Sequence, residues 1–236
     1  MDTPTFLVWC VAQMGAVGAA AWAHGARTLR TDRVRPRALA AALAAAPVGA
    51  IGAEYILHAG AHLARHGRGL PPVHGSMAYG ALAAYALVQA ALAPRGRRWE
   101  ALGDAVGPLA CLVAVGRLGC AAGGCEPGIV LVGMVRHPVA LYEVAVALGA
   151  WALAWRVEAA RGARGRFVAF ALAYAAGRAA IECLRDPGPL TGAGPTVAQW
   201  VSLGVASATL LAATSTRARR SAPASDASEP ESRLRA

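Results

Sequence analysis

The chain alternates long apolar blocks with short arginine-rich connections. Seven of these blocks have about the 17–25 residues that a helix needs to cross a bilayer. We therefore predict an all-α, polytopic membrane protein with about seven transmembrane helices. The predicted spans are residues 6–26, 38–60, 74–93, 102–119, 138–155, 167–184 and 197–214.

The arginines between the blocks predict the orientation of the helices in the membrane. Arginine is dense after the first, third, fifth and seventh blocks and sparse after the others, and an excess of arginine marks the cytoplasmic side. The N-terminus is then outside and the C-terminus inside, in agreement with an odd number of spans. The dense segments are residues 27–37, 95–98, 156–166 and 217–220.

These patterns divide the chain into two parts. Residues 1–216 form the predicted transmembrane helical domain. Residues 217–236 are rich in Ser, Ala, Pro and charge and lack an apolar face, so we predict a disordered cytoplasmic tail. Residues 1–5 carry Asp2 and no basic residue, which disfavours a cleaved signal peptide. We expect the first block to remain as a membrane helix.

The composition excludes an ordinary soluble domain. The chain is 56% hydrophobic and 15% charged, with a mean hydropathy of +0.43, whereas soluble domains are about 45–50% apolar and about 25% charged. A net charge of +10 raises the question of nucleic-acid binding. The arginines flank apolar blocks, however, and no nucleic-acid motif accompanies them. The five scattered cysteines define no disulfide framework.

Ionisable residues inside the predicted spans are candidates for function, because a charge at membrane depth is costly. Arg178 and Glu182 stand four residues apart on one helical face, and Tyr174 precedes them by one turn. Two interpretations stay open. The two residues form an ion pair that neutralises itself in the bundle, or Arg178 is presented to an anionic headgroup and Glu182 orients it.

Two further clusters lie before and at the start of the fifth span. The glycine-rich GRLGCAAGGCEPG, residues 116–128, places Arg117 at the outer boundary, where by itself an interfacial arginine is the simpler interpretation. In HPVALYE, residues 137–143, Pro138 suits the first helical position. Glu143 then lies about one and a half turns inside the membrane, which helix capping does not explain.

A metal site is the weaker interpretation of the remaining polar residues. Glu54, His58 and His62 repeat at helical spacing, which suits a metal on one helix face, but an interfacial polar stripe is favoured. Cys120 and Cys125 supply at most half of a zinc site. His74 opens the third span in VHGSMAYG and is uninformative by itself.

Together these clusters resemble prolipoprotein diacylglyceryl transferase, from residue 74 to residue 202 most strongly. VHGSMAYG is similar to the family's His-Gly-Gly helix start, and GRLGCAAGGCEPG to its signature G-R-x-G-N-x-x-N-G-E-x-x-G. HPVALYE resembles H-P-S-Q-L-Y-E, YAAGRAAIECLRDPG resembles the Tyr…G-x-x-R-x-x-x-E-x-x-R-x-P-D stretch, and TVAQWVSL resembles G-Q-x-L-S. The chain departs from the signature at Cys120, Gly123 and Cys125.

The resemblance implies a set of site residues. His74 falls on the family's essential histidine, and Arg117 and Arg178 fall on its two phosphate-side arginines. Tyr174 and Glu182 complete the catalytic group that we expect. The expected substrate-binding residues are Arg117, Arg178, His137, Tyr142, Glu143, Gly128 and Gln199.

The resemblance also implies the chemistry, which is transfer of diacylglyceryl from phosphatidylglycerol to a lipobox cysteine in preprolipoproteins. His74 is the expected general base, and Arg117 and Arg178 stabilise the departing phosphate. No metal or dissociable cofactor is required. The expected location is the bacterial cytoplasmic (inner) membrane.

Three other functions stay open. The first is a paralogue that uses another acceptor or donor or has lost catalysis. The second is a protein that binds or transports an anionic lipid or small anion with the same arginines. The third is a metal-binding membrane protein built on Glu54, His58 and His62.

Overall fold

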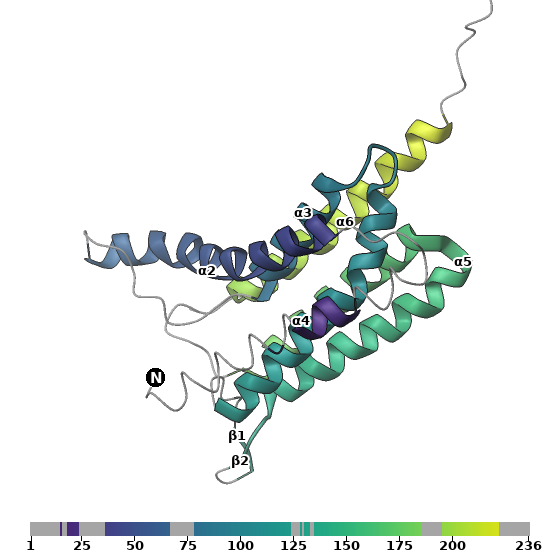
Figure 1. The fold of residues 1–236 in the computed structure, drawn as a ribbon. Coiled ribbons are helices and arrows are strands. Elements are labelled where there is room, and N and C mark those ends of the chain that lie inside the picture. The colour runs from purple at the N-terminus through teal and green to yellow at the C-terminus, as the bar shows by residue number, and fades with distance from the viewer. Residues whose placement is uncertain are drawn as a thin grey trace, which may run out of the picture.

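The computed structural model describes residues 15, 18–23, 36–66, 78–123, 128, 130–132, 135–185 and 195–221. The all-α prediction agrees with this part of the chain, in which two short antiparallel strands, β1 (Val130–Val132) and β2 (Val135–Arg136), accompany the helices. The helices are α2 (Pro36–His66), α3 (Ala78–Leu92), α4 (Arg98–Gly123), α5 (Val139–Glu182) and α6 (Val197–Ser221), as Figure 1 shows.

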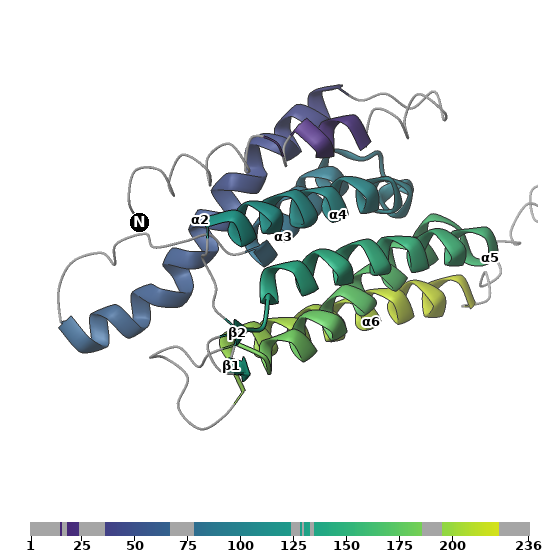
Figure 2. The same ribbon diagram turned by 90° about the horizontal axis from the view of Figure 1, so that it is seen from below.

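Helix α5 is a helical hairpin rather than one continuous rod. Gly162 interrupts it with φ 63° and ψ −167°, a conformation that glycine adopts without steric cost. The chain then folds back on itself (Figure 2). A Cβ atom added at Gly177 would lie 2.5 Å from the Val146 side chain, so the two halves pack closely. They correspond to the two predicted spans 138–155 and 167–184.

The connection between these two spans is shorter than the sequence suggested. Arg166, which we assigned to the arginine-rich connection, lies on the second half of α5 and is buried. Its Nη1 atom is 3.3 Å from Glu158 Oε2 on the first half. The helix thus begins before the predicted span 167–184, since an arginine that pairs across the hairpin is tolerated on a helix that continues beyond the apolar block.

Three helices are long and apolar enough to cross a membrane: Arg98–Ala122, Val139–Glu182 and Val197–Ser215. Two shorter apolar helices, Arg37–Ala53 and Ala78–Leu92, accompany them. These helices have the character of a membrane protein. The number of seven spans stays a prediction, and most of the first predicted span lies outside the described residues.

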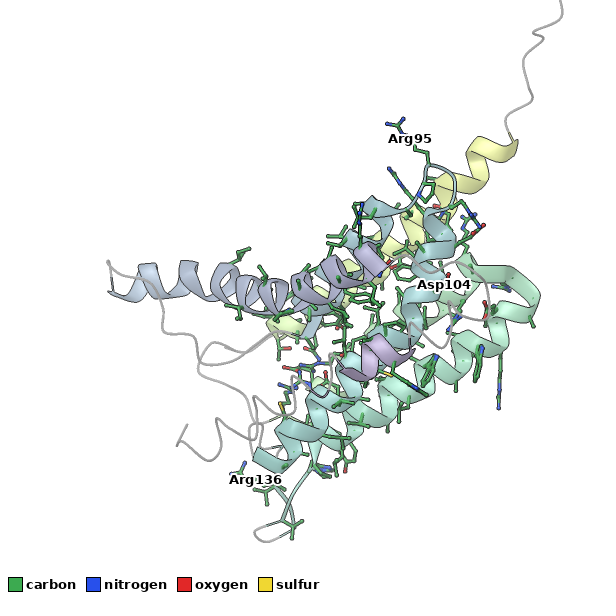
Figure 3. All side chains as sticks on the ribbon, viewed as in Figure 1. Arg95, Asp104 and Arg136 are labelled. Atoms are coloured by element: carbon green, nitrogen blue, oxygen red, sulfur yellow. The ribbon has the colours of Figure 1, made fainter. Side chains whose placement is uncertain are left out.

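The two ends of the bundle carry arginines from connections that we predicted on opposite sides of the membrane. Figure 3 shows Arg95, in the connection between α3 and α4, at one end and Arg136, in β2, at the other. Helix α6 continues to Ser221, past the boundary at residue 216 that the sequence suggested. Residues 222–236 of the predicted tail lie outside the described part.

The core is built from small side chains with a few large ones between them. Alanines at the helix contacts allow the backbones to approach closely, and Tyr85, Val106 and Phe170 fill the remaining space at the centre. Many large apolar side chains on α6, such as Leu203 and Leu211, are exposed instead. This outward apolar surface suits contact with lipid rather than with water.

The crossing of α2 and α3 requires glycine on both helices. A Cβ atom at Gly80 would lie 2.2 Å from the Gly49 carbonyl oxygen and 2.6 Å from Ala53 Cβ. We expect Gly80→Val to destabilise the fold by about 1–3 kcal/mol, the usual effect of overpacking, and to lower the midpoint of thermal unfolding in detergent. Gly52→Ala is the matched control, since a Cβ there meets nothing within 4 Å. Equal midpoints for the two variants would contradict this packing.

Candidate functional site

A fully buried carboxylate, that of Glu143, lies at the centre of the candidate site. Its exposed fraction is 0%, and it stands on the first half of α5. Three guanidinium groups surround it. Arg117 Nε lies 3.0 Å from Glu143 Oε2, Arg178 Nε 3.2 Å from Oε1, and Arg185 Nη2 3.3 Å from Oε2. Carboxylate and arginines therefore come together from α4, both halves of α5 and the turn after it.

A second carboxylate, that of Glu182, links two of these arginines to each other. It pairs with Arg178, four residues earlier on the same helix, and its Oε2 atom lies 3.0 Å from Arg185 Nε. The Tyr174 hydroxyl donates to Glu143 Oε1 at 3.0 Å. We call the three arginines and two glutamates the arginine–glutamate cluster. Among these five described residues, three are basic and two are acidic.

The buried arginines give the cluster a preference for anionic groups. Arg117 and Arg178 are 8% and 5% exposed, so little water compensates their charge. A buried charge is costly unless it is paired, so groups of opposite charge are favoured next to these arginines. A guanidinium group also has five N–H donors in a planar fork that matches phosphate and carboxylate oxygens. The donor groups of the cluster are therefore suited to bind an anionic group.

Helix α4 positions Arg117 differently from the sequence interpretation. We expected the fourth span to end at residue 119, before most of the glycine-rich segment 116–128, but α4 continues to Gly123. The interfacial interpretation of Arg117 is wrong, because its side chain is buried and paired with Glu143 on α5. Arg117 Nη1 also lies 4.0 Å from Cys120 Sγ, one turn further along the helix.

The Gly128 backbone contacts two arginines, Arg185 of the cluster and Arg136 of β2. It forms a β-bridge with Arg185, and its carbonyl accepts a hydrogen bond from Arg136 Nη1 at 3.0 Å. A Cβ atom at this position would lie 2.5 Å from the His137 carbonyl oxygen, so only glycine fits without movement. Gly128 thus fixes Arg185 beside the start of α5.

His137 and Tyr142 lie together at the start of α5. His137 Nδ1 is 3.2 Å from the Tyr142 hydroxyl. Pro138 is the residue before the first helical position rather than the first position itself, since α5 begins at Val139. Among the described contacts, His137 and Tyr142 pair with each other. Glu143, from the same HPVALYE motif, belongs to the cluster.

The Gln199 side chain fixes the start of α6 against α5. Its Oε1 atom accepts from the Thr196 backbone N–H at 2.9 Å, and the Gln199 backbone N–H donates to Thr196 Oγ1 at 3.2 Å. This reciprocal pair is a capping box. Gln199 Nε2 also donates to the Ala179 carbonyl oxygen at 3.2 Å, one residue from Arg178. The geometry gives Gln199 a positioning role.

Two residues at the candidate site were absent from the set that the sequence suggested. Arg185 appeared only within the motif YAAGRAAIECLRDPG, although its spacing from Arg178 and Glu182, seven and three residues, places all three on one helical face. Tyr79 stood unremarked within VHGSMAYG. Its ring packs edge-on against Tyr174, with centroids 5.7 Å apart and an interplanar angle of 68°.

Several predicted residues lie outside the described part of the chain. These are His74 and Cys125, together with the side chains of Glu54, His58 and His62. Within the described part, no group of three or more His, Cys, Asp or Glu side chains is placed to hold a metal ion. The metal-binding alternative therefore stays a prediction for the undescribed side chains.

Comparison with known proteins gives one finding. The family model described as prolipoprotein diacylglyceryl transferase matches residues 7–214, which is most of the chain. No curated protein matches the chain significantly. The matched range includes every member of the arginine–glutamate cluster.

Proposed function

Because the chain belongs to the prolipoprotein diacylglyceryl transferase family, we propose that it transfers diacylglyceryl from phosphatidylglycerol to the cysteine thiol of a lipobox. The family is a transferase family that acts on prolipoprotein and lipid substrates. The observation that carries the more specific proposal is the convergence of Arg117, Arg178 and Arg185 on Glu143.

The charge of the cluster supports phosphatidylglycerol as the donor. Its headgroup is a phosphodiester with one negative charge and a neutral glycerol, and three converging arginines supply donors for its phosphate oxygens. A zwitterionic lipid would bring an additional cation next to three arginines. That cation would be repelled in a site of low dielectric. A monoanionic phosphodiester is therefore the preferred ligand.

The proposed reaction is a nucleophilic substitution at the glyceryl carbon that bears the phosphate. The thiolate sulfur attacks this carbon, the carbon–oxygen bond breaks, and its electron pair leaves with the phosphate oxygen. The products are a thioether and glycerol phosphate. The thiol proton passes to a general base, for which His74 is the candidate, and no metal or dissociable cofactor is needed.

The arginines of the cluster have the central role in this reaction. Negative charge grows on the departing phosphate, and preorganised guanidinium donors stabilise that charge strongly where water is excluded. Glu143 and Glu182 hold the guanidinium planes in place, and Tyr174 fixes the Glu143 carboxylate. Gly128, His137, Tyr142 and Gln199 maintain the helix ends around the cluster.

We also propose the orientation that the arginine pattern predicts, with seven spans, the N-terminus outside and the C-terminus in the cytoplasm. The site then lies toward the outer side of a bacterial inner membrane. The position of Arg95 and Arg136 at opposite ends of the bundle supports this arrangement (Figure 3). A prolipoprotein whose lipobox lies near that side would reach the cluster.

The proposal is tested by incubating the purified protein with labelled phosphatidylglycerol and a lipobox peptide. We expect a peptide carrying a diacylglyceryl thioether, detected by mass spectrometry, and no product from a peptide with Ser in place of Cys. Retention of the lipid without any thioether would contradict the proposal and favour an anionic-lipid binding or transport protein. Product from a different acceptor alone would favour the paralogue.

A further inference from the structure

A pair of hydroxyl groups lies beside the arginine–glutamate cluster, and the proposed function gives it no role. The hydroxyl of Tyr79 on α3 is 2.6 Å from the hydroxyl of Ser202 on α6. The Tyr79 ring contacts Tyr174, whose own hydroxyl donates to Glu143. Glu143, Glu182 and Arg178 lie near enough to interact electrostatically with the Tyr79 phenol. Tyr79 therefore brings a hydroxyl group from α3 close to the cluster.

The hydrogen bonds of this pair determine which atom donates. Ser202 Oγ donates its single proton to the Ala198 carbonyl oxygen at 2.7 Å, and a serine hydroxyl has one proton to give. The proton between Tyr79 and Ser202 must then come from Tyr79. Because Ser202 is 2% exposed, this arrangement is held inside the protein. A Tyr79 hydroxyl that donates to Ser202 still has lone pairs with which its oxygen can accept a hydrogen bond.

We propose that Tyr79 is a substrate-binding residue whose phenolic oxygen accepts a hydrogen bond from a hydroxyl group in the headgroup of the donor lipid. The inference rests on the proposed function and extends it to the polyol part of the substrate. Tyr79 is half-buried, so part of its surface remains accessible to a ligand. Each hydrogen bond to a buried acceptor that a competitor cannot make contributes to specificity.

A headgroup hydroxyl suits the Tyr79 oxygen better than two other hydrogen-bond donors, the thiol of the acceptor peptide and an ammonium headgroup. The hydroxyl is joined covalently to the phosphate, so binding of the phosphate by Arg178 holds the hydroxyl close to Tyr79. The attacking sulfur must approach the glyceryl carbon from the side opposite the departing phosphate, which places it away from the headgroup. An ammonium headgroup would place a further positive charge next to three arginines, which would repel it.

The test compares two donor lipids and three proteins. The lipids are phosphatidylglycerol and phosphatidylpropanol, which keeps the phosphodiester and the three-carbon chain but lacks both hydroxyls. For the parent protein we expect a higher kcat/KM with phosphatidylglycerol. Tyr79→Phe removes only the phenolic oxygen and should lower the ratio of the two kcat/KM values about fivefold, the typical effect of one hydrogen bond between neutral groups.

Tyr85→Phe is the matched control. Tyr85 lies on the same helix, is fully buried, and accepts a hydrogen bond from Gln89 Nε2 at 3.4 Å within the bundle. Its loss should leave the ratio between the two lipids unchanged. A merely structural role of Tyr79 predicts equal loss with both lipids, and this outcome would overturn the proposal. A rise of KM for the peptide alone would also overturn it.

Equilibrium binding separates this inference from the proposed function. Retention of the two lipids by the detergent-solubilised proteins, measured by native mass spectrometry, should show the same fivefold change in preference for Tyr79→Phe. If the parent protein forms no thioether but shows this change, the proposed reaction fails and the role of Tyr79 stands. An unchanged preference in the binding measurement overturns the role of Tyr79 whether or not transfer occurs.

Discussion

Replacement of Arg178 by alanine is expected to lower the rate of thioether formation at least about a hundredfold, while the protein remains in the membrane. Arg178 contacts both carboxylates of the cluster, so it holds the geometry as well as the substrate phosphate. Loss of one preorganised donor to a developing negative charge commonly costs about 10²–10³ in rate. The measurement is the initial rate with phosphatidylglycerol and a lipobox peptide, at equal amounts of folded protein.

Two further variants give this prediction its controls. Arg178→Lys keeps the charge but loses the planar fork, so we expect an intermediate rate. Arg97→Ala removes an arginine whose side chain is 46% exposed and pairs with Glu100 at 2.9 Å, and transfer should continue at the parent rate. Transfer by Arg178→Ala at the parent rate would show that this arginine does not act on the phosphate.

The second large effect is expected on stability, from Glu143→Gln. This change preserves size and an acceptor for Tyr174 but removes the charge that compensates three arginines. Removal of one partner from a buried ion pair typically costs about 3–5 kcal/mol. For a chain of this size, we expect a decrease in the midpoint of thermal unfolding on the order of 10 °C.

The control for this prediction is Glu100→Gln. Glu100 belongs to an exposed ion pair with Arg97, and such pairs contribute about 0–1 kcal/mol, so the midpoint should change little. The double variant Glu143→Gln with Arg185→Gln also removes one of the positive charges that Glu143 compensates. It should therefore recover part of the lost thermal stability. If Glu143→Gln unfolds at the parent temperature, the carboxylate does not hold the cluster together.

The sequence predicted those parts of the site that depend on short-range spacing. Arg178 and Glu182 pair as their separation of four residues indicates, and Glu143 lies inside the bundle as its distance from Pro138 indicates. Residues of one helix share a face by geometry alone. Such relations need no knowledge of how the helices pack, and so they were accessible at the level of the sequence.

Contacts between helices could not be predicted from the sequence in the same way. The pairing of Arg117 with Glu143 joins α4 to α5, and nothing in the spacing of the two residues determines it. The extent of α4 was also underestimated, because the apolar block was ended at residue 119 although the helix continues through Gly119 to Gly123. Glycine lowers helix propensity only modestly, and packing against α5 outweighs that preference.

Other signals were present in the sequence and were missed. Arg185 continues the face of Arg178 and Glu182, and T-x-x-Q at residues 196–199 is a capping-box pattern. The role of Gln199 at the start of α6 therefore has a local explanation. The placement of His74 lies outside the described residues, and its role as general base stays a prediction.

Competitive lipid binding tests most directly whether the cluster recognises a monoanionic phosphodiester. Native mass spectrometry of the parent protein with equal amounts of phosphatidylglycerol and phosphatidylethanolamine should show preferential retention of phosphatidylglycerol. Arg117→Ala, which removes one guanidinium group from Glu143, should lose most of that preference. Equal retention of both lipids by the parent protein, or an unchanged preference in Arg117→Ala, would contradict an anion site formed by the converging arginines.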